Sequence, residues 1–342
     1  MDKNPQPLNS NPPCARSPKS GARATLLLIA SIVLIGVLAE GCQSAPPAVN
    51  SPSVLALLPQ GARAYFYLDV AHNRQLAVDF VKASSGVTGH QVSASESQGL
   101  QYAIDRTYRI YGALSAGHIY LIGIGDYPGF LFSIGMKQNS DWKEMTMSVA
   151  GRSRSYWQQV KGGSRLQLAL TGGGTLIASD GDIATLFARQ ERGVTASPAV
   201  PDSVVNQFSR EDLVLYAPSS NPTSTPSAGF SPSLFGQLLV LGARTGSVAA
   251  GGGGPAAYDM SLRVTTQSER EARTISVLLR LGLISLLSQN SSGSNPQVSR
   301  ADLMRNLSFT IAGSTIEVTG ITLSTADLSS LVFQFTRGSG IN

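Results

Sequence analysis

The sequence predicts an α+β fold made of two similar halves, each with antiparallel strands or hairpins that pack against helices. Short runs in which large apolar residues alternate with small or polar ones are typical of strands. Longer segments carry apolar residues at helical spacing. A unit of strand, glycine turn, strand and capped helix also begins near residue 165 and again near residue 307. We therefore expect a first half at residues 54–190, a linker at 191–203 and a second half at 204–342.

The first 41 residues have the composition of a signal peptide. A polar opening with four basic residues precedes an apolar run from Ala24 to Leu38. This run is shorter than the roughly 20 residues that a membrane-spanning helix needs. We therefore expect cleavage in preference to a retained single-pass anchor. An ordinary secretory signal, cut elsewhere, is the remaining alternative.

The run ends in Leu38-Ala39-Glu40-Gly41-Cys42, which resembles the lipobox of bacterial lipoprotein precursors. Ala39 and Glu40 depart from the usual pattern and fit the looser spirochaetal form better. The resemblance implies that Cys42 carries a diacylglyceryl group and becomes the mature N-terminus. Lipid attachment would also explain why a mature exported chain keeps a single cysteine, which cannot form an internal disulfide.

The residues after Cys42 form a predicted tether, because 42–53 are rich in proline, serine and alanine and lack charge. The chain as a whole has 42% apolar and 14% charged residues, which excludes a wholly disordered protein. Its net charge of +5 is scattered, without runs of lysine or arginine. A nucleic-acid partner would need a basic stripe, so we expect none. The expected partners are a membrane, through the N-terminal lipid, and another envelope protein.

The first half should begin with a strand at 62–70, after the turn Pro59-Gln60-Gly61. Helices are expected through Leu76–Val81 and through Leu100–Tyr111. A hairpin of 118–125 and 128–136 should follow, because Phe130, Phe132, Ile134 and Met136 alternate with smaller residues.

The first half should close with strands at 165–170 and 175–179 around a glycine turn. Ser179 and Asp182 have capping-box spacing before a helix. The apolar face of this helix would be Ile183, Leu186 and Phe187.

In the second half, strands are expected at 213–216 and 258–264. Ser268 and Glu271 should cap a strongly apolar helix at 275–287, which we expect to be buried between the two halves. The closing hairpin should have Leu307, Phe309 and Ile311 on one strand and Ile316 and Val318 on the other, with a capped helix after Ser324. Loops are expected at 217–233, 247–256 and 288–297.

Catalytic and metal motifs are weak throughout. Ser140 and Lys143 match S-x-x-K but no companion motif follows, so Ser140 is interpreted as a helix cap. Asp180-Gly181-Asp182 lacks the other ligands of a calcium loop, and Gly123-Ile124-Gly125 lacks the third glycine of a dinucleotide fingerprint. The three histidines, His72, His90 and His118, are not at metal-ligand spacing. We expect no metal or other cofactor.

Aromatic residues are the remaining candidates for binding. Tyr and Trp in an extracytoplasmic groove bind sugars or peptides through an apolar face and a polar tip. Tyr65, Tyr67, Tyr127 and Trp157 are the predicted ligand-binding residues. The alternative is that they are core residues whose polar atoms reach a partner.

The lipobox, the opening Leu58-Pro59-Gln60-Gly61-Ala62-Arg63-Ala64-Tyr65-Phe66-Tyr67-Leu68-Asp69 and the repeated α+β plan resemble uncharacterised spirochaetal, particularly treponemal, lipoproteins. The resemblance implies an address at the cell envelope and brings no known activity. We expect a non-enzymatic interaction module. A lipid-anchored protein that binds a small ligand, sugar or peptide, is the alternative, and a hydrolase comes third.

Overall fold

The computed structural model describes most of the chain after residue 53. The described residues are 54–78, 101, 103–115, 117–160, 165–172, 174–192, 200–208, 210–218, 238–245, 257–290, 307–324 and 328. The predicted signal peptide (1–41), Cys42 and the tether (42–53) lie outside them. His90 and the predicted helix after Ser324, apart from residue 328, lie outside them too.

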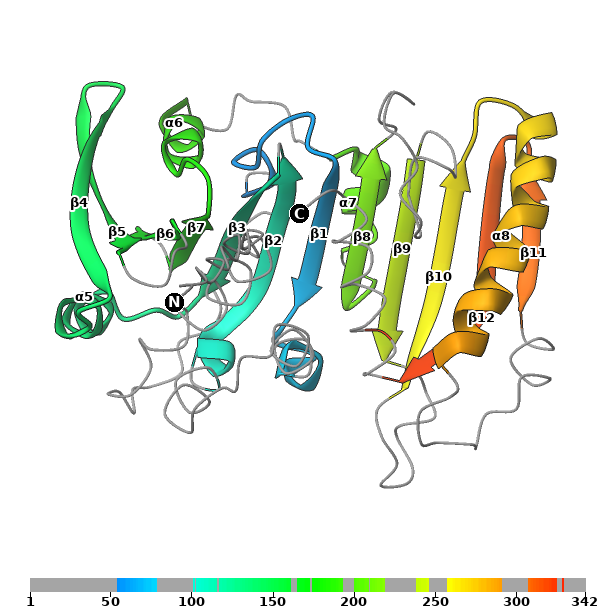
Figure 1. Cartoon of the computed structure of the whole chain (residues 1–342), viewed down its shortest axis with the longest axis horizontal. Helices are drawn as coiled ribbons and strands as arrows, with labels where there is room; N and C mark the ends of the chain where they lie inside the picture. The colour runs from blue at the N-terminus through cyan, green and yellow to red at the C-terminus, as the bar shows by residue number, and fades with distance from the viewer. Residues whose placement is uncertain are drawn as a thin grey trace, which may run out of the picture.

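Twelve antiparallel strands form one sheet in the described residues, in the order β11-β12-β10-β9-β8-β1-β2-β3-β7-β6-β5-β4 (Figure 1). The strands of the first half are β1 (Ala64–Asp69), β2 (Thr107–Ser115), β3 (His118–Gly125), β4 (Trp142–Val149), β5 (Arg152–Gln159), β6 (Gln167–Thr171) and β7 (Thr175–Ser179). Those of the second half are β8 (Leu213–Pro218), β9 (Leu238–Thr245), β10 (Ala257–Thr265), β11 (Ser308–Ala312) and β12 (Thr315–Ser324).

The predicted α+β class is confirmed. The labelled helices are α5 (Gly129–Gln138), α6 (Ala184–Arg192), the four-residue α7 (Asp202–Val205) and α8 (Glu269–Asn290). Each half carries three neighbouring strands followed by a returning hairpin: β1-β2-β3-β7-β6 matches β8-β9-β10-β12-β11 in order. The first half adds the β4–β5 ribbon outside β6. The domain boundaries and a true duplication stay predictions.

The halves join where β1 pairs with β8, with Tyr65 opposite Tyr216 and Leu68 opposite Leu213. Because side chains alternate along a strand, β1 supplies both sides of the sheet. Tyr65, Tyr67, Tyr111 and Tyr216 are buried on one side, here called the aromatic face. There they meet Phe208 and buried residues of α6 and α7.

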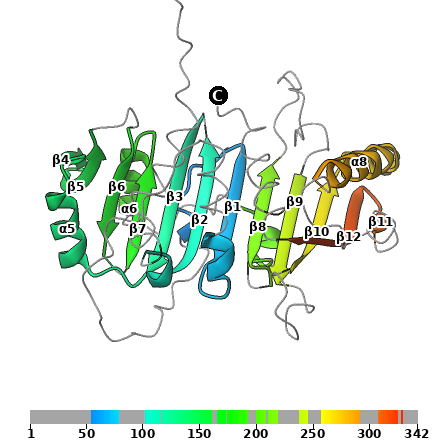
Figure 2. The ribbon, with the colours of Figure 1, turned by 60° about the horizontal axis from the view of Figure 1, so that its bottom comes forward.

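The opposite face carries the larger apolar core. Leu68 and Leu215 share it with buried residues of β10 and β12, so this core runs through both halves. The helices α5 and α8 cover this face through residues such as Phe132 and Leu279. In Figure 2, α8 lies at one end of the sheet beside β11 and β12, and α5 lies near the β4–β5 end.

Several strands agree with the sequence. The strands β1, β8 and β10 and the hairpins β6–β7 and β11–β12 lie where they are expected, while β4, β5 and β9 were not predicted. The predicted apolar face is buried: Leu186 and Phe187 lie on α6, and Ile183 directly precedes it. Its first turn is capped by Asp182, whose Oδ1 accepts a hydrogen bond of 2.9 Å from the Ala184 N–H. Ser179 Oγ instead accepts from Gly181 N–H at 3.0 Å.

The predicted strand at 128–136 is wrong, because this segment is the helix α5. Phe132 and Met136 are buried, while Phe130 is 76% exposed. Apolar residues at every second position include pairs four apart, and two such residues share one face of a helix. The alternation therefore fits either structure, and the core contacts of Phe132 and Met136 favour the helix.

The predicted helix through Leu100–Tyr111 ends earlier than expected, because β2 begins at Thr107 and includes Tyr108 and Tyr111. Thr107 Oγ1 donates a 2.7 Å hydrogen bond to the carbonyl of Ala103 at this change of structure. Tyr111 pairs with Tyr67 across the β1–β2 ladder. The helical spacing of the tyrosines led to the wrong prediction, because Tyr111 is buried by its neighbours in the sheet and not by packing of a helix.

Two further expectations are wrong. Ser140 does not cap a helix, since the chain turns there from α5 into β4, and Asn139 Oδ1 accepts a 2.9 Å hydrogen bond from Asp141 N–H. The helix α8 is not buried between the halves. Its buried residues face β11 and β12 at one end of the sheet, and Ser268 Oγ accepts a 3.2 Å hydrogen bond from Glu271 N–H at its start, as the capping box predicts.

Candidate functional site

Two of the predicted binding residues lie inside the aromatic face. Tyr65 is 2% exposed, and its hydroxyl donates a 2.8 Å hydrogen bond to the Pro59 carbonyl. Tyr67 is 1% exposed, stacks on Phe208 with 4.5 Å between ring centroids, and donates a 3.2 Å hydrogen bond to Asp69 Oδ2. Burial raises the pKa of both phenols, and the Asp69 carboxylate raises that of Tyr67 further.

The other two lie on the opposite face. Trp157 is 7% exposed within the larger core. The side chain of Tyr127 lies against Gly123 and Gly125. An added Cβ would come 2.8 Å from the Tyr127 hydroxyl at Gly123 and 2.8 Å from the Tyr127 ring at Gly125. Its hydroxyl shares a 2.8 Å hydrogen bond with Thr107 Oγ1, and burial raises the pKa of the phenol.

The sheet therefore separates the four aromatic residues, and each has a packing or hydrogen-bonding role in the core. Ligand binding by these side chains stays a prediction. Gly123 and Gly125, set aside as a dinucleotide motif, are required for the close approach of Tyr127.

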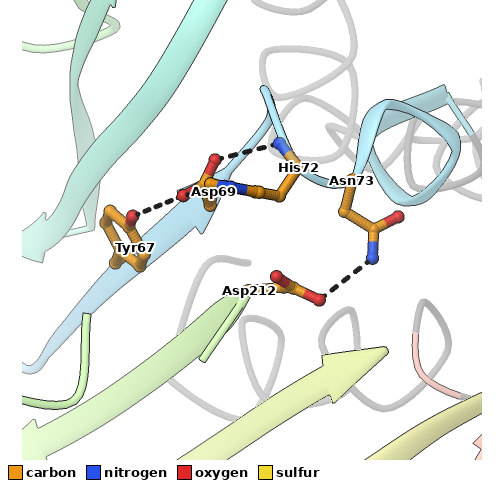
Figure 3. Close-up of polar contacts among 5 residues, drawn as sticks. All are labelled: Tyr67, Asp69, His72, Asn73 and Asp212. Carbon is orange, nitrogen blue, oxygen red and sulfur yellow. Dashed lines mark hydrogen bonds and ion pairs between the residues drawn. The ribbon is translucent and has the colours of Figure 1, made fainter. Parts of the chain in front are cut away.

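A polar cluster at the end of β1 was not predicted (Figure 3). Asp69 is 7% exposed, and its Oδ1 accepts a 3.1 Å hydrogen bond from the backbone N–H of His72. The Oδ2 atom of Asp69 lies 2.9 Å from His72 Nδ1. The carboxylate thus orients an imidazole whose side chain is 76% exposed.

The same corner connects the two halves. Asn73 Nδ2 donates a 3.3 Å hydrogen bond to Asp212 Oδ2, just before β8 (Figure 3). Asn73 Oδ1 accepts a 2.8 Å hydrogen bond from the Tyr258 hydroxyl of β10 and a 3.2 Å bond from Leu76 N–H. Residues 139 and 185 positions apart are thereby joined. We call Asn73, Asp212 and Tyr258 the inter-half joint.

An Asp–His pair suits general-base chemistry when the imidazole reaches a nucleophile. Among the described residues, Asp69 is the only side chain that hydrogen-bonds to His72, and no serine does so. The Asp69 contacts with His72 and the Asn73 contact with Leu76 also match the way such residues cap turns and short helices. The cluster therefore serves the corner between β1 and the helix at 74–78.

A second Asp–His pair lies near the opposite ends of these strands, at the start of β3 and just after β7. His118 Nδ1 is 3.6 Å from Asp180 Oδ1, which accepts a 2.7 Å hydrogen bond from Ile119 N–H. Burial raises the pKa of Asp180, while the Ile119 N–H and His118 oppose this shift. Six residues of β2 separate the levels of the two pairs, or roughly 20 Å. In the described part of the chain no group of three or more metal-ligating side chains is assembled.

The outward side of α8 carries three of the six exposed large hydrophobic residues of the described surface. Ala272, Ile275, Leu279 and Leu283 are buried against the sheet. The residues on the other side, Val277, Leu278 and Leu281, are 60%, 57% and 60% exposed and form what we call the α8 outer surface. Within the described ranges no helix, α8 included, has the length and apolarity needed to cross a membrane. In the sequence this surface is indicated by apolar residues on every side of the helix, more than one sheet face can cover.

The architecture defines the chain as an α+β protein with one long antiparallel sheet. Its fold is similar to that of TP0453, a treponemal protein. Crystal form IV of TP0453 aligns with a TM-score of 0.53 and 16% sequence identity over 83% of this chain and 97% of that chain. Crystal form I gives 0.53 and 14%, and crystal form III 0.50 and 15%, each over 83% and 98% of the two chains. No protein-family model and no curated protein matches the sequence.

Proposed function

We propose that the chain is a lipid-anchored envelope lipoprotein without enzymatic activity that binds another envelope protein through the α8 outer surface. The observation that carries the proposal is the exposure of Val277, Leu278 and Leu281 on a helix whose other side is already buried. Contiguous apolar side chains on a protein surface are typical of sites that contact a partner.

The polar and charged side chains of the described surface that are discussed above have structural roles. The Asp69–His72 and Asp180–His118 pairs support corners of the fold. Arg273 pairs with Glu269 on α8, and the Arg280 guanidinium lies 4.6 Å from the centre of the Phe309 ring. These contacts hold the arginines beside the apolar stripe, so that it has the polar rim common at protein interfaces.

The envelope part of the proposal is supported by the lipobox around Cys42 and by the shared fold with TP0453, a treponemal envelope protein. In a Cys42→Ala variant we expect radiolabelled palmitate incorporation to be lost and the protein to move from the membrane to the soluble fraction. Cys14→Ala is the matched control and should label like the unmodified chain. Persistent labelling of Cys42→Ala would contradict the anchor.

The interaction itself is tested by native mass spectrometry of the full lipoprotein, extracted from its own membranes in mild detergent. We expect co-eluting protein subunits with the unmodified chain and their loss with Val277→Ser/Leu281→Ser, because apolar contacts at the centre of an interface carry most of its energy.

Val160→Ser is the control, since Val160 is 55% exposed and lies outside α8. It should retain the co-eluting subunits. A bare monomer for the unmodified chain, or a complex that survives the α8 substitutions, would contradict the proposal.

A further inference from the structure

The two ends of the sheet differ in how their last strand is protected. In the first half, β6 is covered by β5 of the β4–β5 ribbon, with Trp157 opposite Leu168 and Gln158 opposite Gln167. In the second half, β11 occupies the position equivalent to β6 and ends the sheet in the described part of the chain. At the equivalent position of the first half, β6 accepts the further antiparallel strand β5, so within the described residues β11 is the corresponding edge without such a strand.

The sequence of β11 lacks the features that usually prevent pairing at an edge. Ser308-Phe309-Thr310-Ile311-Ala312 contains no charge and no proline and is rich in residues that favour strands. The outer strand at the other end, β4, carries Lys143 and Glu144. Four of the five β11 residues are exposed, and only Phe309 is partly buried.

From this asymmetry we propose that β11 pairs antiparallel with β11 of a second copy of this chain, which makes a symmetric dimer through the sheet edge. The inference rests on the proposed function and identifies the envelope protein that is bound as a second copy of this chain. A two-fold axis at Thr310 places the two Thr310 residues opposite each other. On either side of them, Phe309 of one copy lies opposite Ile311 of the other. Thr–Thr pairs and aromatic pairs with β-branched residues are favourable cross-strand neighbours. The strand is therefore complementary to itself, as a two-fold interface requires.

The α8 outer surface lies at the same end of the molecule. The helix packs on β11 and β12 (Figure 1). The Arg280 guanidinium also lies over the Phe309 ring of β11. Pairing of two β11 strands would bring the two α8 helices to the same side of the enlarged sheet. The exposed Val277 and Leu281 of both copies would then lie on that same side, where apolar contacts can add to the backbone hydrogen bonds of the five-residue strand.

The test is disulfide cross-linking of the full chain in its native membranes. Thr310→Cys should give, on oxidation, a disulfide-linked species of twice the chain mass, because directly opposite residues in a sheet lie within the Cα separation that a disulfide spans. Ser308→Cys is the matched control. In the proposed register its copies are roughly 14 Å apart, too far to be bridged. The double variant Ser308→Cys/Ala312→Cys should cross-link again, and the unmodified chain controls for Cys14 and Cys42.

A second variant tests the pairing without a cross-link. Thr310→Lys places two like charges opposite each other and should weaken self-association by roughly tenfold or more. Thr146→Lys, at an exposed position of β4, should leave it unchanged.

The outcomes separate this inference from the proposed function. A disulfide between Thr310→Cys and a different protein, or equal cross-linking of Thr310→Cys and Ser308→Cys, would overturn self-pairing and leave the interaction module in place. If the unmodified chain is a monomer in native mass spectrometry and the α8 substitutions change nothing, both this inference and the proposed function are overturned.

Discussion

At the scale of single residues, Gly125 and the side chain of Tyr127 are in close contact on the face of the sheet opposite the aromatic face. An alanine at Gly125 would place its Cβ 2.2 Å from the Arg106 carbonyl oxygen and 2.8 Å from the Tyr127 ring. The carbonyl is held by a 2.9 Å hydrogen bond from Asp126 N–H, and the Tyr127 hydroxyl is held by its 2.8 Å hydrogen bond with Thr107 Oγ1.

Gly125→Ala should therefore destabilise the protein by about 1–3 kcal/mol, the usual cost of overpacking a tight site. Gly172→Ala is the control, since nothing lies within 4 Å of its Cβ position, and it should change stability by less than about 0.5 kcal/mol. Urea unfolding of both variants measures the difference. Equal midpoints would contradict the tight contact.

Asp180 gives a residue-scale prediction about pH. Burial raises the pKa of its carboxyl above the ordinary value of 3.8, so the folded protein binds this proton more tightly than the unfolded chain. The resulting stabilisation is fully present below pH 3.8 and is lost as pH rises through the folded pKa. Asp180→Asn retains an acceptor for Ile119 N–H and removes the titration.

As pH rises from below 3.8 past the folded pKa, the unfolding free energy of the unmodified protein should fall relative to that of Asp180→Asn. Urea titrations at a series of pH values measure this difference. A difference that is constant, or that changes in the other direction, would show that Ile119 N–H and His118 outweigh burial.

At the scale of elements, α5 shows how burial separates two structures with the same apolar pattern. In a strand, Phe130 and Phe132 would lie on one face and be buried alike. In the helix α5, Phe132 is 4% exposed and Phe130 is 76% exposed.

Phe132→Ala should therefore cost about 3–5 kcal/mol of stability, while Phe130→Ala should stay within about 0.5 kcal/mol of the unmodified protein. The two substitutions remove the same atoms, so each is the control for the other. Thermal unfolding followed by circular dichroism provides the measurement. Similar losses for both variants would favour the strand over α5.

At the scale of the whole molecule, one sheet and the apolar cores on its two faces bind the halves together. The β1–β8 ladder and the inter-half joint connect segments that are far apart in sequence. We therefore expect the halves to unfold as one cooperative unit. Both tryptophans, Trp142 and Trp157, lie in the first half, so tryptophan fluorescence reports on that half alone.

Tyr258→Phe removes the hydrogen bond to Asn73 Oδ1 from the second half and should cost about 1 kcal/mol. Because the halves are coupled, the urea midpoint seen by tryptophan fluorescence should fall together with the midpoint seen by far-ultraviolet circular dichroism. A fluorescence midpoint that does not move while the other one falls would show that the halves unfold independently.

Sequence alone was sufficient for the α+β class, for the hairpins β6–β7 and β11–β12 and for the apolar face of α6. These features depend on local patterns: alternation, glycine turns and capping residues act within a few positions of one another. The targeting segment and Cys42 are likewise local patterns, and their role stays a prediction from the sequence.

Only the tertiary structure decided that α5 is a helix, that β2 begins at Thr107 and that α8 exposes Val277, Leu278 and Leu281. It also decided that the predicted aromatic residues lie on both faces of the sheet and that Asn73 reaches Asp212 and Tyr258. The reason is physical: burial and long-range hydrogen bonds depend on which segments become neighbours, and a pattern of apolar residues does not specify the surface that will cover it.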